Sequence, residues 1–134
     1  MTSMQSMIRE RSTPDDQQRL KAGAHELQRA AGKVLKHARA AEDLQALGVA
    51  LAHIEEALDR LSVGMLQAAA AVTEGHGDSA DDSRMEPSAE ALGFHLRLTA
   101  ERLREAQLAC QSSRFWRWRM IASAPLTAAA RALA

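Results

Sequence analysis

The residues best equipped for chemistry form one short run near the C-terminus, Arg114-Phe115-Trp116-Arg117-Trp118-Arg119. It holds three of the four aromatic residues of the chain. Arginine interleaved with tryptophan suits a protein partner, a membrane headgroup layer, or single-stranded nucleic acid, whose bases stack on aromatic rings. The alternative is structural. Phe115, Trp118 and Ala122 share a helical face with Leu108, and this face would close the end of a helical bundle while the arginines stay in solvent.

A second candidate for chemistry is His25, which is followed by Glu26 and Leu27. This tripeptide resembles the phosphoacceptor box of two-component histidine kinases and phosphotransfer bundles. The resemblance implies histidine phosphotransfer at His25, which the heptad pattern places beside the apolar seam on the solvent side. It covers three residues, and the following Gln28-Arg29-Ala30 departs from the basic residue and Thr-Pro, or the Lys-Gly, of such boxes. Without a glycine-rich nucleotide motif we expect no autokinase activity.

The remaining histidines and the single cysteine do not form a recognisable site. His37, His53, His76 and His95 occur singly, without the Glu-x-x-His repeats typical of metal sites in helical bundles. Cys110 falls at a core position of a predicted helix and has no second thiol for a disulfide. No acid, base and nucleophile converge. We therefore expect no catalytic residue, no metal and no cofactor, and the sequence predicts that the protein is not an enzyme.

Composition indicates a helical, soluble domain. The 134 residues suit one domain, and 17 basic and 17 acidic side chains give a net charge of zero, which argues against a nucleic-acid partner. Aromatic residues are 3% of the chain, whereas alanine is abundant, a composition that favours closely packed helices over sheets. No apolar run approaches the ~18 residues of a membrane-spanning helix, and the start of the chain is too polar for a signal peptide. One cysteine and no such segment indicate a cytoplasmic protein.

The central predicted helix runs from Leu44 to Val72. Its apolar residues alternate at spacings of three and four, which describes one continuous seam that other helices must cover: Leu44, Leu47, Leu51, Ile54, Leu58, Leu61, Met65, Ala68 and Val72. A further heptad stripe of small residues beside the seam predicts a third helix in that groove: Ala50, Ala57, Gly64 and Ala71.

The helix before it is predicted to start at Thr13-Pro14 and to pack on the central helix as an antiparallel hairpin. Its apolar seam has two columns of residues at heptad spacing. One column holds large side chains, Leu20, Leu27 and Val34, and the other holds alanines, Ala24, Ala31 and Ala38. The joint at residues 39–43 is either a short turn capped by Asp43 or a local overwinding of one unbroken helix, and we favour the turn.

The third helix is predicted to start between Ser83 and Ser88, where either Ser83 with Glu86 would form a capping box or Ser88 would be the cap. Its predicted seam is Leu92, Leu96, Thr99, Leu103, Ala106 and Cys110. Phe94 and Leu98 lie off this seam and form a second apolar spot.

The fold class expected is all-α, an antiparallel up-down bundle of three long helices plus a short C-terminal helical segment that could serve as a fourth. The expected organisation is a mobile arm at 1–12, a bundle at 13–122 with helices at about 14–39, 43–74, 86–112 and 113–122, and a tail or short helix at 123–134.

The function expected from the sequence is that of a non-catalytic interaction module, which binds a protein partner or a second copy of itself. The surface expected to make this contact is Phe94, Leu98, Arg114, Phe115, Trp116, Arg117, Trp118 and Arg119. Attachment to a membrane surface through the 114–119 run is the alternative, and phosphotransfer at His25 is a third.

Overall fold

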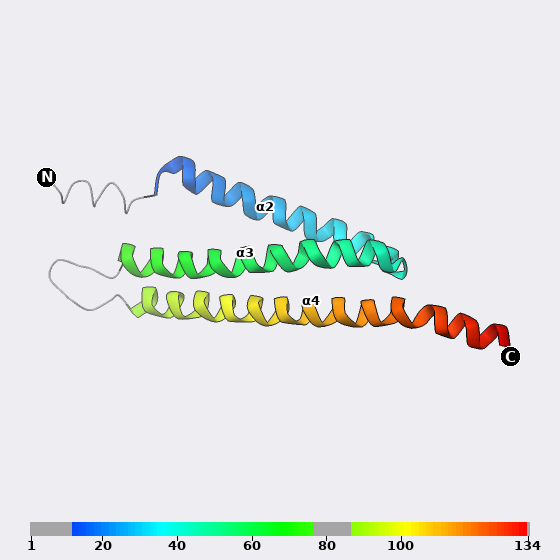
Figure 1. The fold of residues 1–134 in the computed structure, drawn as a ribbon. Coiled ribbons are helices and arrows are strands. Elements are labelled where there is room, and N and C mark those ends of the chain that lie inside the picture. The colour runs from blue at the N-terminus through cyan, green and yellow to red at the C-terminus, as the bar shows by residue number, and fades with distance from the viewer. Residues whose placement is uncertain (1–11, 77–86, 134) are drawn as a thin grey trace, which may run out of the picture.

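The regular elements of the computed structural model are all helical over the residues that it describes, 12–76 and 87–133. In chain order they are α2 (Pro14–Lys36), the 3-10 helix η1 (Ala38–Glu42), α3 (Leu44–His76) and α4 (Pro87–Leu133). The three long helices lie together, as Figure 1 shows. The predicted all-α class is therefore confirmed for this part of the chain. Most of the expected arm at 1–12 and the Ser83–Glu86 capping box lie outside the described residues.

Helix α2 begins with the capping residues that the sequence suggested. The Thr13 hydroxyl accepts a hydrogen bond from the amide of Asp16 at 3.0 Å, and the Asp16 carboxylate accepts one from the amide of Thr13 at 3.4 Å. Pro14 occupies the first turn, where its missing N–H costs nothing. Together these contacts satisfy amides that have no partner within the helix.

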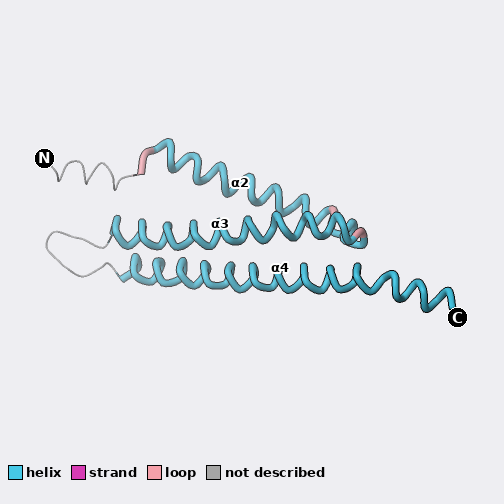
Figure 2. Tube along the Cα trace, in the orientation of Figure 1, coloured by secondary structure: helices cyan, strands magenta, loops and turns pink. Residues whose placement is uncertain are grey.

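A turn joins α2 to α3, so the alternative of one unbroken helix is wrong. Helix α2 ends at Lys36, and η1 reverses the chain before α3 starts at Leu44 (Figure 2). Asp43 caps α3, because its Oδ1 accepts hydrogen bonds from the amides of Gln45 at 2.9 Å and Ala46 at 3.2 Å. This cap replaces the glycine or proline that the turn lacks.

Helices α3 and α4 form an antiparallel pair. Residue numbers rise along α3 as those of its neighbours on α4 fall: Gly48 lies at Arg117, Glu55 at Gln111 and Arg114, Ser62 at Ala100, and Ala69 and Thr73 at Gly93. The same arrangement is visible in Figure 1, where the two helices lie side by side.

Small residues make the closest contact between α3 and α4. Ala69 and Ala100 are only 1% and 2% exposed, and Ser62 and Ala89 are also buried. The predicted α4 seam is half right: Leu96, Leu103 and Cys110 are partly buried, whereas Leu92, Thr99 and Ala106 are exposed. The residues that are buried or partly buried in place of these three each lie one position later in the sequence: Gly93, Ala100 and Gln107. Small side chains let the two backbones approach closely, and this outweighs the burial of one more leucine.

The third helix does not occupy the groove beside the small-residue stripe of α3. Helix α4 lies instead along a heptad column of Gly48, Glu55, Ser62 and Ala69, two positions before the stripe. Two positions are about 200° around a helix, so α4 packs on nearly the opposite side from the one predicted. Ala50, Ala57 and Ala71 of the stripe are exposed.

Helix α2 covers α3 only loosely. It contains no buried residue, and Leu20 in its large column is 75% exposed. The helix lies nearest α3 at the η1 joint and diverges from it toward the start of α2 (Figure 1). The two helices and their turn are present as predicted, but the close packing predicted between them is not found. The apolar pattern identified the face of α2 correctly but not what covers it.

Helix α4 is one continuous element, so the separate helical segment expected at 113–122 is not found. The helix continues through Pro125 to Leu133 and extends beyond the start of α3 (Figure 1). Its last turns bend away from the axis of the rest, as expected where proline removes a backbone hydrogen bond.

Candidate functional site

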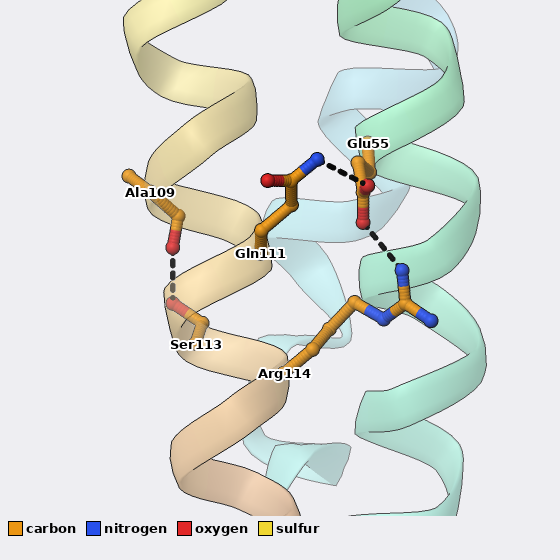
Figure 3. Close-up of polar contacts among 5 residues, drawn as sticks. All are labelled: Glu55, Ala109, Gln111, Ser113 and Arg114. Carbon is orange, nitrogen blue, oxygen red and sulfur yellow. Dashed lines mark hydrogen bonds and ion pairs between the residues drawn. The ribbon is translucent and has the colours of Figure 1, made fainter.

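The 114–119 run lies on α4 beside the first turns of α3, and its arginines do not all face solvent. Arg114 reaches across to α3, where its Nη1 lies 2.6 Å from Oε2 of Glu55. Gln111 donates from Nε2 to the other carboxylate oxygen of Glu55 at 3.1 Å. Figure 3 shows both side chains of α4 converging on this one carboxylate.

Glu55 is the main polar residue of this interface, and it was not among the predicted site residues. Its side chain is 15% exposed. The hydrogen bond from Arg114, and then that from Gln111, lower the pKa of Glu55 from its usual value of 4.5, although partial burial opposes them. The signal for it was available, because Glu55 falls between Gly48 and Ser62 at heptad spacing.

Arg117 also turns toward α3. Its guanidinium lies over Gly48, in the space that a Cβ atom at this position would occupy. The Nε atom of Arg117 is buried and has no hydrogen-bond partner among the described residues. No described carboxylate forms an ion pair with this side chain.

The aromatic residues of the run are exposed, which reverses the structural alternative considered above. Trp116 is 64% exposed, and Phe115, Trp118 and Leu108 are exposed as well. They do not close the end of a bundle. Arg114 and Arg117 reach toward α3, and the rings of Phe115 and Trp118 line a hollow beside them although each side chain is more than half exposed. Phe115 contacts Trp116 edge to face, with ring centroids 5.4 Å apart.

A cleft of about 390 Å³ opens at this place, which we name the Arg117 cleft. Its lining combines two guanidinium groups, two aromatic rings, an amide and a glycine: Arg114, Arg117, Phe115, Trp118, Gln111 and Gly48. The arrangement provides positive charge, hydrogen-bond donors and flat apolar walls in one hollow.

Phe94 and Leu98 are not part of the same surface. Phe94 is exposed and contacts the ring of His95 edge to face, and Leu98 is partly buried. They lie about 20 residues before the aromatic run, which is about 30 Å along an α-helix. The residues predicted to make contact with a partner are therefore divided between two places on α4.

A larger hollow separates α2 from α3, and we name it the α2–α3 groove. It has a volume of about 710 Å³ and is lined from α2 by Leu20, Ala24 and Leu27 and from α3 by Ala57, Leu61 and Met65, among others. A further hollow of about 300 Å³ follows near the η1 joint, between Val34 and Ile54. The spacing of these apolar residues predicted a closed core, and the structure instead leaves them along open hollows.

The remaining candidates stand apart from one another. His25 is exposed on α2, and phosphotransfer there stays a prediction. Cys110 is a partly buried free thiol. Among the described residues, no three His, Cys, Asp or Glu side chains gather where they could hold a metal ion. Within the same residues, no helix combines the length and apolarity needed to cross a membrane.

Comparison of the chain with protein-family models, curated proteins and solved structures gave no match.

Proposed function

We propose that this protein is a non-catalytic helical interaction module that associates through the α2–α3 groove, with a second copy of itself as the first partner to test. The observation that carries the proposal is the exposed apolar seam of α2. Leu20, Leu27 and Val34 recur at heptad spacing on one face, and all three are exposed.

The energetics favour a covered seam. Helix α2 has 23 residues and buries none of them, whereas helices in proteins owe most of their stability to packing of an apolar face. Full burial of a leucine or valine contributes about 1.5–3 kcal/mol relative to exposure. Covering the three large residues of α2 would therefore supply several kcal/mol, enough to hold the helix in place.

The lining of the groove suits a helix. Apolar side chains of α2 and α3 line its two sides, and charged residues such as Arg19, Glu56 and Arg60 lie among its lining. An apolar floor with polar edges is the usual arrangement for an amphipathic helix bound in a groove. In the complex, an inserted helix would complete a closed antiparallel bundle around α3.

Sedimentation velocity over a range of protein concentrations tests the proposal. We expect a dimer that Leu27→Asp converts to a monomer, because the substitution places a charge in the groove. Leu108→Asp is the matched control, since Leu108 is an exposed leucine of α4 outside the groove. Amide exchange in α2 should slow as the dimer forms. A monomer at every concentration, with α2 exchanging rapidly, would count against self-association.

A second candidate function is attachment to a membrane surface, as a peripheral protein in the cytoplasm. It is favoured by the exposure of Phe115, Trp116 and Trp118 beside arginines, since such rings partition to the headgroup layer. Flotation with anionic vesicles tests it. The full chain should float, and the double substitution Trp116→Ala with Trp118→Ala should remain with the free protein.

A further inference from the structure

We propose that the Arg117 cleft is a binding site for a phosphate group, carried either by a lipid headgroup or by a soluble phosphate compound. The site lies on α4 and the start of α3, away from the α2–α3 groove, so it does not depend on self-association. It gives the membrane candidate a specific chemistry in the case that a lipid is the source.

The first observation is that the cation of Arg117 has no partner among the described residues. Its Nε atom is buried and makes no hydrogen bond, and no described carboxylate pairs with its guanidinium. A buried polar atom without a partner has lost its hydrogen bonds to water and has gained none in return. An anion that accepted hydrogen bonds from this guanidinium would remove much of the electrostatic cost of holding it there.

The second observation is the position of Arg117 at the positive end of a helix. Its guanidinium lies over Gly48, in the second turn of α3, a helix of 33 residues. The N-terminal end of a helix carries a partial positive charge and favours anions. This end of α3 therefore adds a small contribution in favour of a negative group beside Arg117, smaller in the second turn than in the first.

The third observation is that the neighbouring acid is already neutralised. Glu55 is the described carboxylate that enters this part of the α3–α4 interface, and it is bound to Arg114 at 2.6 Å and to Gln111 at 3.1 Å. Asp43 caps α3 through its Oδ1. With Glu55 matched by Arg114, the cleft keeps the charge of Arg117 as its surplus.

The walls of the cleft indicate the kind of molecule that carries the phosphate. Phe115 and Trp118 line the hollow beside the guanidinium groups. Arginine matches the oxygen geometry of phosphate through paired hydrogen bonds, and the rings would contact an apolar or planar body attached to it. A phospholipid headgroup with its glycerol and a soluble phosphate ester both have this form.

Fluorescence of Trp118 provides a direct test, because this tryptophan lines the cleft and Trp116 does not. In a Trp116→Phe background, Trp118 is the one remaining tryptophan. We would titrate this protein with inorganic phosphate, with vesicles of phosphatidylglycerol in phosphatidylcholine, and with phosphatidylcholine vesicles alone. A saturable change with phosphate and with anionic vesicles indicates a site open to soluble phosphate. A change with the anionic vesicles alone indicates that a lipid is the source.

Matched variants identify the residue responsible. Arg117→Gln should weaken binding about 10- to 100-fold, the range expected for one charge-assisted contact. Arg119→Gln removes the same charge from the same run, outside the cleft, and should change binding less than about twofold. Gly48→Ala keeps the charge but displaces the Arg117 guanidinium, so it should also weaken binding. Circular dichroism and thermal unfolding check that each variant is folded.

The proposal is overturned by no saturable response to any probe, by an equal response to phosphatidylcholine alone, or by equal losses in Arg117→Gln and Arg119→Gln. The last result would mean that only net charge matters. Leu27→Asp, which tests the groove, should leave the phosphate titration unchanged.

Discussion

The hydroxyl of Ser62 in α3 donates a hydrogen bond to the backbone carbonyl of Ala100 in α4 at 2.9 Å. Both residues are buried. A side chain as short as serine reaches the backbone of the facing helix only where the two helices approach closely. This bond therefore marks a place where α3 and α4 approach each other closely.

Replacing Ser62 tests that packing. Ser62→Ala should lower the free energy of unfolding by about 0.5–1.5 kcal/mol, the usual net value of one hydrogen bond. Ser62→Leu should cost more, about 1–3 kcal/mol or above, because its side chain does not fit between the backbones. Chemical denaturation measures both.

Ser113→Ala is the control. The hydroxyl of Ser113 is exposed and bonds within its own helix, to the carbonyl of Ala109 (Figure 3), so loss of this hydrogen bond should change the free energy of unfolding little. Equal effects at the two serines would contradict the close approach.

The same contact explains why the sequence predicted helices well and their pairing only in part. Apolar spacing located each apolar face and half of the α4 seam, because Leu96 and Leu103 are large residues on the inner side. It failed for Ala100 and Gly93, since a count of large residues treats small ones as neutral. In this pair the small residues define the interface. A search for glycine, alanine and serine at heptad spacing on both helices would have located it.

Gly93 gives a second test of close packing. A Cβ atom there would lie 2.9 Å from Cγ2 of Thr73, whose hydroxyl is bonded to the carbonyl oxygens of Ala69 and Ala70. Gly93→Ala should therefore destabilise the protein by about 1–3 kcal/mol from overpacking, less the ~1 kcal/mol that alanine contributes to a helix.

Gly64→Ala is the matched substitution, since nothing lies within 4 Å of a Cβ atom at that position of α3. It should stabilise the monomer by up to ~1 kcal/mol. Thermal unfolding of the two variants should thus move in opposite directions. Two stabilised variants would show that α3 and α4 have room for a methyl group between them.

The ion pair between Glu55 and Arg114 predicts a dependence of stability on pH. Because the folded protein lowers the pKa of Glu55, its carboxylate contributes stability above the usual value of 4.5, and this contribution is lost as the pH falls through the lower folded value. The free energy of unfolding should decrease on acidification below roughly pH 5. Glu55→Gln should be less stable than the natural protein at neutral pH, and its stability should fall less between neutral and acidic pH. Glu56→Gln, which removes an exposed pair with Arg60 within α3, should keep the original pH dependence.

The polar part of the site was harder to predict than the aromatic part. Composition drew attention to Trp116 and Trp118, and both are exposed, as a contact surface requires. The pairing of Arg114 with Glu55 depends on which residues of the two helices face each other. The contact of Ser62 with Ala100 fixes this alignment of α3 and α4. The spacing of the large apolar residues within one segment does not show which residues of the two helices face each other.

Leucines on α2 and α4 should respond differently to truncation. Leu20 on α2 is largely exposed, whereas Leu103 on α4 is partly buried against α3. In the monomer, Leu20→Ala should change the free energy of unfolding by less than about 0.5 kcal/mol, and Leu103→Ala should lower it by about 2 kcal/mol. If α2 binds a second copy through its seam, the cost of Leu20→Ala should grow as the protein concentration rises, because association adds to stability by mass action. Denaturation at several concentrations therefore separates the two contributions. A large cost of Leu20→Ala that is the same at every concentration would mean that α2 packs on α3 within one chain, as the sequence pattern first suggested.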